Sequence, residues 1–232
     1  MCGRFNVTSS PLSELLLELV GLPHPGPDNY NAAPTETIVV LRMNDDGRPE
    51  LVAMRWWLTP FWSKSVTTKY SMFNAKSETV EKSPAFREPF SRRRCVVPVS
   101  GFYEWARSKE RKLPYYLTPH LASGMLLAGI WDSWQDGENG PLLSFAVLTC
   151  EANEQLTFVH KRQPVMLGMK DARIWLDPST QASALKALCA PRVPVALDAV
   201  PVSSYVNNAR NKDSRCTEAI GTAVAIREDV TA

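Results

Sequence analysis

Cys2 is the residue whose position allows the most distinctive chemistry in this 232-residue chain. A small residue after the initiator methionine permits removal of Met1, which would leave Cys2 with a free α-amine beside its thiol. The ordinary pKa values of these two groups are about 7.7–8.0 and about 8.5, so both reach their nucleophilic forms near neutral pH. An aldehyde would condense with the amine to a Schiff base, and the thiol would then close a five-membered thiazolidine ring. Taken alone, Cys2 is explained as well by a cysteine that merely follows methionine.

Glu104 is a carboxylate among aromatic residues. It lies in the run GFYEW, where a strand would place Phe102 on the same face and the two aromatic residues that flank Glu104 on the other. A carboxylate in such surroundings is costly unless it is paired or functional. We therefore expect either general acid–base catalysis or a structural ion pair with a nearby arginine.

His160 is the histidine best placed for proton transfer. It follows an expected helix over residues 151–159 and precedes two basic residues. Imidazole changes its charge near neutral pH, which suits a proton shuttle, although a histidine at the C-terminus of a helix is often only a favourable cap. The other two histidines, His24 and His120, lie in proline-containing loops and are expected at the surface.

Asn74 lies in a stretch where basic and aromatic residues alternate. A lone asparagine is usually a turn or cap residue. However, rings that stack on unpaired bases and cations that neutralise phosphates are the usual components of a site for single-stranded nucleic acid. The basic and aromatic residues in question are Arg55, Trp56, Trp57, Phe61, Trp62, Lys64, Lys69, Lys76, Arg87, Arg92, Arg93 and Arg94. Each ring could also belong to the core, and at least one of Trp56 and Trp57 should point inward.

The composition is that of an ordinary globular protein, with 44% hydrophobic and 22% charged residues. A formal net charge of +2 neither requires nor excludes a nucleic-acid partner. No signal peptide fits the start, and apolar runs such as 125–131 are far shorter than the ~20 residues of a membrane span. The five cysteines are widely spaced, and no C-x-x-C or H-x-x-x-H pair is present. We therefore expect a cytoplasmic protein with reduced thiols and with no metal site, cofactor or membrane contact.

The segments that must hold these residues are mostly short strands. Ser10-Pro11 and a leucine stripe that ends before Gly21 predict an N-terminal helix. Strands are expected at 37–43, 51–57, 94–99, 102–105, 115–118, 125–131, 142–149 and 193–202. Further helices are expected at 151–159, 172–176 and 182–189. This mixture predicts an α+β fold, with a single domain over residues 1–232 that has a curled, barrel-like, mainly antiparallel sheet, flanking helices and a polar tail from about residue 222.

Seven ordered motifs are spread over nearly the whole chain. They are 1–5 (MCGRF), 30–35 (YNAAPT), 74–79 (NAKSET), 94–105 (RCVVPVSGFYEW), 128–131 (AGIW), 149–153 (TCEAN) and 160–165 (HKRQPV). Together they resemble the SRAP family, the SOS-response-associated peptidase-like proteins that shield abasic sites in single-stranded DNA. Three positions depart from the family pattern, because Lys76 stands in place of arginine, Trp57 in place of glycine and Gln163 in place of methionine. Lysine keeps the charge but loses bidentate binding to phosphate.

The resemblance implies a reaction and a role for each residue. Cys2, freed of Met1, would form the thiazolidine with the C1′ aldehyde of a ring-opened abasic sugar, and Asn74 would hold this end group. Glu104 would act as acid and base in Schiff-base formation and its reversal, and His160 would assist ring opening of the sugar. The expected DNA-binding residues are Arg4, Lys76, Arg87 and Arg162 for phosphates, Phe61 and Trp62 for flanking bases, and Pro34 packed beside them. The partner would be single-stranded DNA containing abasic sites, bound by a cytoplasmic monomer that is nucleoid-associated if the protein is bacterial.

Two other functions fit the same residues. A cysteine peptidase would use Cys2 as nucleophile, with His160 and an Asn or Glu as base and orienting residue, and removal of its own Met1 would be one outcome. A non-catalytic module for single-stranded DNA would need only the basic and aromatic residues. A DNA adduct that survives denaturation and requires Cys2 separates the crosslinking function from both.

Overall fold

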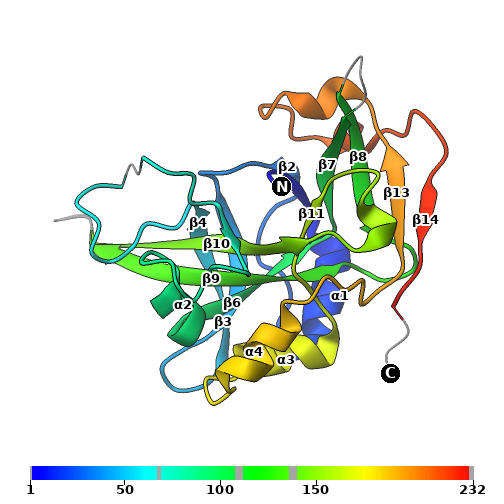
Figure 1. Cartoon of the computed structure of the whole chain (residues 1–232). Helices are drawn as coiled ribbons and strands as arrows, with labels where there is room; N and C mark the ends of the chain where they lie inside the picture. The colour runs from blue at the N-terminus through cyan, green and yellow to red at the C-terminus, as the bar shows by residue number, and fades with distance from the viewer. Residues whose placement is uncertain (1, 67–68, 108–111, 136–139, 230–232) are drawn as a thin grey trace.

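Five strands close into a barrel (Figure 1). They are β3 (Thr37–Met43), β4 (Pro49–Trp56), β6 (Arg94–Val99), β9 (Met125–Gln135) and β10 (Pro141–Glu151). Neighbouring strands pair in the order β4-β3-β6-β9-β10. Strand β10 then pairs in parallel with β4, and this last pairing closes the barrel. The computed structural model describes residues 2–66, 69–107, 112–135 and 140–229.

Three short strands extend the barrel sheet beside β9 and β10. They are β5 (Asn74–Lys76), β11 (Arg162–Pro164) and β12 (Met166–Leu167). Strand β5 runs parallel to β10 and β11 runs antiparallel to it, and both meet the C-terminal half of β10. Asn74 and the segment that follows His160 are therefore brought to the same part of the barrel.

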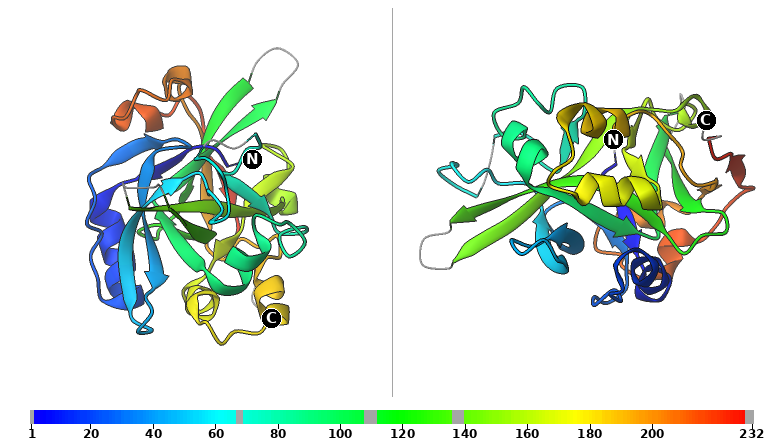
Figure 2. Two further views of the ribbon diagram at one scale, coloured as in Figure 1. Left: turned by 90° about the vertical axis from the view of Figure 1, so that its left-hand side faces the viewer. Right: turned by 90° about the horizontal axis from the view of Figure 1, so that it is seen from below.

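A second, antiparallel sheet lies beside the barrel (Figure 2). Its strands, in spatial order, are β14 (Val224–Ile226), β13 (Leu197–Pro201), β8 (Lys112–Pro119), β7 (Gly101–Arg107), β1 (Phe5–Val7) and β2 (Asn29–Ala32). Only Ser100 separates β6 of the barrel from β7 of this sheet. The N-terminal strand β1 pairs with β7, so the start of the chain is fixed next to the strand that carries Glu104.

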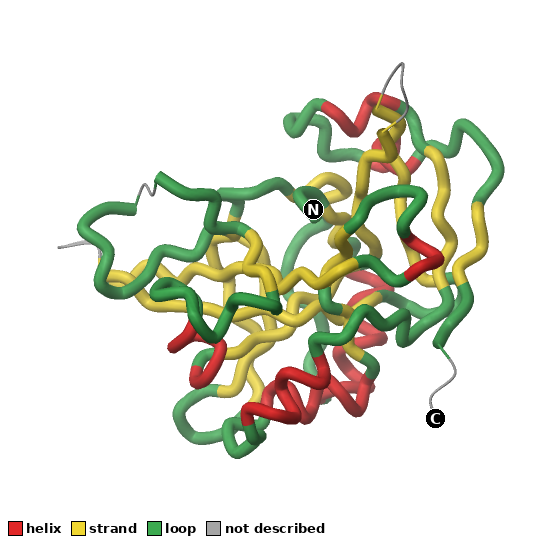
Figure 3. Tube along the Cα trace, viewed as in Figure 1, coloured by secondary structure: helices red, strands yellow, loops and turns green. Residues whose placement is uncertain are grey.

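Four α-helices lie in the described ranges. They are α1 (Ser9–Val20), α2 (Arg87–Arg92), α3 (Met169–Leu176) and α4 (Ala182–Leu188). Helices α3 and α4 are at the lower edge of the molecule in the view of Figure 3. Helix α1 buries Leu12, Leu16 and Leu19, as the leucine stripe predicts, and ends at Gly21, whose φ of 75° is the left-handed conformation typical of a helix C-terminus. Three 3₁₀ segments complete the description: η2 (Glu154–Leu156), η3 (Ser204–Asn207) and η4 (Ser214–Thr217).

The predicted α+β class and the curled, mainly antiparallel sheet are confirmed. The helix expected over residues 151–159 is wrong. Strand β10 continues through Glu151 because this residue pairs with Arg162 of β11, and only the single turn η2 follows, capped by the side chain of Asn153. The strand expected over 193–202 is shorter, at Leu197–Pro201, and the expected polar tail contributes β14, which pairs with β13.

No helix in the described ranges has both the length and the apolar character needed to cross a membrane.

Candidate active site

Cys2 lies in the core between the barrel and the second sheet. Its side chain is fully buried, in the same cluster as Phe5 and Trp56, whose rings stack with centroids 4.1 Å apart. The Cys2 Sγ atom is 4.0 Å from the carbonyl oxygen of Arg4. Burial, together with the negative charge of Glu104, raises the pKa of the Cys2 thiol well above its ordinary value. The thiol is therefore protonated at neutral pH, and this cysteine is not a preformed thiolate nucleophile.

Asn74 holds the backbone of Cys2. Its Nδ2 donates a 2.7 Å hydrogen bond to the carbonyl oxygen of Cys2. Asn74 itself begins β5 and is fixed by parallel pairing with Val147 of β10. Its Oδ1 atom is buried and accepts no hydrogen bond from any described residue. A hydrogen-bond acceptor is thus left over beside the N-terminal segment.

Glu104 and His160 line one small pocket. Glu104 is 4% exposed and lies on β7, opposite Tyr115 of β8. The pocket is lined by Phe102, Glu104, Leu117, Leu156, Val159, His160, Arg162 and Gln163, and its volume of about 10 Å³ has room for about one water molecule. As the alternation of the strand predicts, Phe102 shares the face of Glu104, whereas Tyr103 packs in a separate cluster with Tyr116. Glu104 and His160 share this pocket, and Glu104 is near enough to Cys2 for its charge to act on the thiol.

The backbone of Arg162 orients the ring of His160. The amide N–H of Arg162 donates a 3.0 Å hydrogen bond to His160 Nδ1. Nδ1 also lies 3.1 Å from the carbonyl oxygen of Arg162, so the backbone of this one residue orients the ring in either neutral tautomer. His160 follows one 3₁₀ turn instead of ending a helix, so the helix-cap role considered from the sequence does not apply. The surface position expected for His24 is also wrong, because this histidine is 6% exposed, whereas His120 is exposed and paired with Asp198.

Arg162 is engaged by a carboxylate in the free protein. Its two terminal nitrogens lie 3.0 and 2.9 Å from the two carboxylate oxygens of Glu78, and one of them also donates to the carbonyl oxygen of Thr149. Burial alone would raise the pKa of Glu78, but the hydrogen bonds and charge of Arg162 hold it below its ordinary value. A phosphate can therefore contact Arg162 only if it shares the guanidinium with Glu78 or displaces the Glu78 carboxylate.

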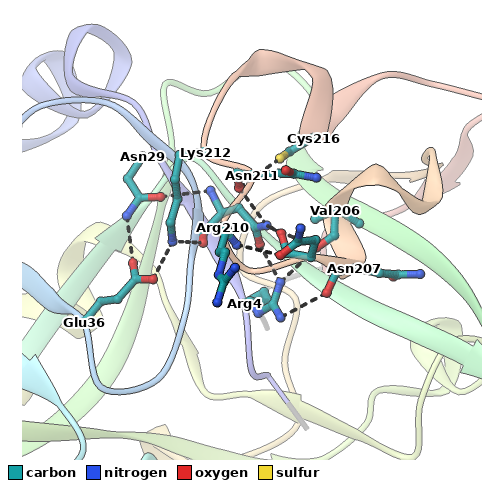
Figure 4. Close-up of polar contacts among 11 residues, drawn as sticks. Arg4, Asn29, Glu36, Val206, Asn207, Arg210, Asn211, Lys212 and Cys216 are labelled. Carbon is teal, nitrogen blue, oxygen red and sulfur yellow. Dashed lines mark hydrogen bonds and ion pairs between the residues drawn. The ribbon is translucent and has the colours of Figure 1, made fainter.

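Arg4 differs from Arg162 because its partners are uncharged (Figure 4). Its Nη1 donates to the side-chain oxygen of Asn31 and to the carbonyl oxygen of Val206, each at 2.9 Å, and its Nη2 lies 3.4 Å from the carbonyl oxygen of Asn207. The guanidinium also lies 5.9 Å from the ring centre of Trp105. Burial lowers the pKa of Arg4, but an arginine remains protonated in proteins. Its charge is therefore available to an anion.

The remaining residues expected to bind DNA divide into two groups. Phe61 and Trp62, in the loop between β4 and β5, are 54% and 55% exposed, and Lys76 is exposed at the end of β5, two residues after Asn74. Pro34 is half-buried. Arg87 is also exposed, but it begins α2 and lines, with residues of α4, a hollow that shares no lining residue with the pocket of Glu104.

Several residues near the site escaped the sequence analysis. Asn31 and Thr35 lie in the YNAAPT motif, but no role was inferred for either. Thr35 has a φ of 79°, a strained conformation for a β-branched residue, and its N–H donates to the carbonyl oxygen of Trp56. Glu78 lies in the NAKSET motif, and its role as the carboxylate that pairs with Arg162 becomes visible only in the structure. In the described part of the chain, no three His, Cys, Asp or Glu side chains gather as they would to hold a metal ion.

The chain belongs to the SRAP family, because the family model described as SOS response associated peptidase (SRAP) matches residues 1–209. Abasic site processing protein YoqW of Bacillus subtilis is 32% identical over 228 residues, which cover 94% of this chain and 99% of that protein. Abasic site processing protein HMCES of Xenopus tropicalis is 30% identical over 224 residues, 83% of this chain and 66% of that protein. A solved structure from Bacteroides thetaiotaomicron has a TM-score of 0.75 and 21% identity, with 94% of this chain and all of that chain covered, and it shows the same fold.

Proposed function

We propose that this protein processes abasic sites in single-stranded DNA by forming a covalent thiazolidine crosslink through Cys2, and thereby shields the lesion. The observation that carries the proposal is the position of Cys2. Its backbone accepts a hydrogen bond from Asn74, and the charge of Glu104, which shares a pocket with His160, acts on its thiol. Family membership and the names of the relatives support abasic-site processing as the biological role.

The reaction begins with opening of the abasic sugar ring, which exposes the aldehyde. His160 delivers a proton to the sugar ring oxygen while the C1′ hydroxyl gives up its proton, and the ring opens to the C1′ aldehyde. The α-amine of Cys2, free once Met1 is removed, adds to this carbonyl carbon, and loss of one water gives the Schiff base. Glu104 carries the protons that the amine nitrogen loses to the oxygen that departs as water, and Asn74 holds the Cys2 backbone in place.

Ring closure consumes the thiol. The Cys2 sulfur adds to the imine carbon, and its proton passes, with Glu104 as carrier, to the nitrogen. One carbon–sulfur bond forms and the imine π bond is lost, so no oxidant or reductant is required. The amine reacts first and the thiol follows, because the five-membered ring closes only onto the carbon of the Schiff base. Reversal follows the same path, with Glu104 in the opposite role.

The proposed DNA path uses Arg4, two residues after Cys2, and exposed groups on the loop before β5 and on β5 itself. Arg4 and Lys76 neutralise phosphates, while Phe61 and Trp62 stack on bases that flank the lesion. Pro34 packs beside them, and Arg162 joins the phosphate contacts if DNA displaces Glu78. Because the crosslink is covalent, this groove needs only to deliver the aldehyde to Cys2, so a small net charge is sufficient.

The experiment that tests this proposal uses an oligonucleotide with one abasic site. The wild-type protein should give a band that survives denaturing electrophoresis, whereas Cys2→Ala, or one residue inserted before Cys2, should give none. Cys189→Ala is the matched control, since it removes another buried thiol, one that bonds to Leu185 of the adjoining helix α4, and it should leave the adduct intact. Absence of an adduct with cleavage of a peptide would favour a cysteine peptidase, which the family description names. Full DNA affinity without any adduct would favour a binding module.

A further inference from the structure

Asn31, in strand β2, is fully buried and uses all its side-chain hydrogen-bonding groups. Its Oδ1 accepts a 2.9 Å hydrogen bond from Arg4. Its Nδ2 donates toward the carbonyl oxygens of Val206, Asn208 and Asn211, at 3.1, 3.1 and 3.0 Å. These carbonyls belong to a loop that lies 175 to 180 residues further along the chain. One side chain thus joins strand β2 to the segment 206–211.

The backbone of Asn31 is held by Lys212, which Figure 4 shows paired with Glu36. Lys212 Nζ donates a 2.7 Å hydrogen bond to the carbonyl oxygen of Asn31 and pairs with Glu36. Glu36 in turn accepts a 3.0 Å hydrogen bond from the side chain of Asn29. Asn31 therefore cannot turn its amide without breaking contacts on both sides, and the segment 206–211 is fixed against β2.

This arrangement holds Arg4 without neutralising it. Arg4 contacts the Asn31 amide oxygen and the carbonyl oxygens of Val206 and Asn207, and all of these acceptors are uncharged. Asn207 is itself fixed, because its side-chain oxygen accepts a 2.7 Å hydrogen bond from Trp105. An aspartate at position 31 would have nearly the same shape but would form an ion pair with Arg4 and could not donate to the three carbonyls.

We propose that Asn31 is a positioning residue that holds the Arg4 guanidinium, through the segment 206–211, so that it contacts a DNA phosphate with its charge intact. This inference rests on the proposed function, in which Arg4 is a phosphate contact. It adds a requirement for an amide at position 31 and for an ordered segment 206–211.

The test measures how the affinity for an undamaged single-stranded oligonucleotide depends on salt, because no covalent bond forms with such DNA. Each phosphate contact to a single strand contributes about 0.7 to the slope of log affinity against log salt. Arg4→Met should reduce the magnitude of the slope by about 0.7. Asn31→Ala and Asn31→Asp should each do the same, and Asn31→Ala combined with Arg4→Met should reduce it no further. Asn31→Asp is nearly isosteric, so it can replace Asn31→Ala in the test if the alanine variant is too unstable to purify.

Tyr103→Phe is the matched control, because it removes only the hydroxyl that donates to the carbonyl oxygen of Tyr30 and keeps the backbone N–H that donates to Arg4. It should lower stability and leave the slope unchanged. If Arg4→Met reduces the slope but both Asn31 variants keep the wild-type value, Asn31 is only structural and the inference is overturned. An unchanged slope for Arg4→Met overturns it as well. Adduct formation by the wild-type protein on abasic DNA, measured with the same preparation, shows whether the proposed function itself stands.

Discussion

The side-chain amide of Asn74 donates a 2.7 Å hydrogen bond to the backbone carbonyl oxygen of Cys2. The first residues of a chain are usually poorly ordered unless another element holds them. Asn74 supplies such a hold, because it belongs to β5 and β5 is paired with β10 of the barrel. The reactive end group is therefore fixed to the most extensively paired part of the fold.

Asn74→Ala should slow adduct formation about tenfold. The substitution removes one hydrogen bond, which contributes about 1–1.5 kcal/mol, and 1.36 kcal/mol corresponds to a factor of about ten in rate. The measurement is the single-turnover rate on saturating abasic oligonucleotide. Asn44→Ala, in the turn between β3 and β4, is the control and should react at the wild-type rate. A rate for Asn74→Ala within about twofold of wild type would contradict a positioning role.

Glu104→Gln should slow adduct formation by about 100-fold or more, because a positioned acid–base group contributes about 10²–10⁴. The glutamine has nearly the same size, so the midpoint of urea unfolding should change little. The rate of adduct formation should fall. The rate of adduct release, measured after dilution into an excess of a reagent that traps the freed aldehyde, should fall as well, since the same group serves both directions. Wild-type rates in both directions would remove Glu104 from the mechanism.

Trp62→Ala should weaken binding of undamaged single-stranded DNA by about 1–3 kcal/mol, the effect of losing one base–aromatic stack. Because Trp62 is 55% exposed, the free energy of unfolding should hardly change. Leu121→Ala is the control, since Leu121 is 91% exposed and lies in the loop between β8 and β9. Equal affinities of the two variants, measured by fluorescence anisotropy, would show that Trp62 does not stack on a base.

Stability should fall in alkaline solution because of the buried thiols. Burial raises the pKa of the Cys150 thiol to about 12, whereas an unfolded thiol titrates at about 8.5. The stabilising effect is therefore fully present below about pH 8.5 and is lost as the pH rises, by about 1.4 kcal/mol per unit for one thiol. Urea unfolding of Cys150→Ala should show a shallower decline above about pH 8.5 than wild type. An identical decline in both proteins would contradict the assignment.

The sequence predicts the parts of the fold that depend on local patterns. The leucine stripe locates α1, and the alternation around Glu104 correctly places Phe102 on the same face. The closure of the barrel could not be predicted in this way, because it depends on parallel pairing of β4 with β10, whose paired residues Arg55 and Ser144 are far apart in the chain. The helix predicted over 151–159 is wrong because β11 pairs with the end of β10 and extends that strand through Glu151, and the local sequence does not reveal this pairing.

The candidate site shows the same division. Cys2, Asn74, Glu104 and His160 can be named from their types and motifs, and the structure brings them together. The polar partners cannot be named, because a hydrogen bond or ion pair between distant segments leaves no local pattern. Arg162 was expected to contact DNA phosphate, but nothing in its neighbourhood in the sequence predicts its bidentate pairing with Glu78.

The intact mass of the product formed with an oligonucleotide that carries one abasic site tests the central claim most directly. The account predicts the mass of the protein without Met1 plus that of the oligonucleotide, less one water. It also predicts that the Cys2 thiol of the denatured product resists alkylation, because its sulfur is part of the thiazolidine ring. A product that retains Met1, a product whose Cys2 is still alkylated, or the absence of any covalent product would contradict the account.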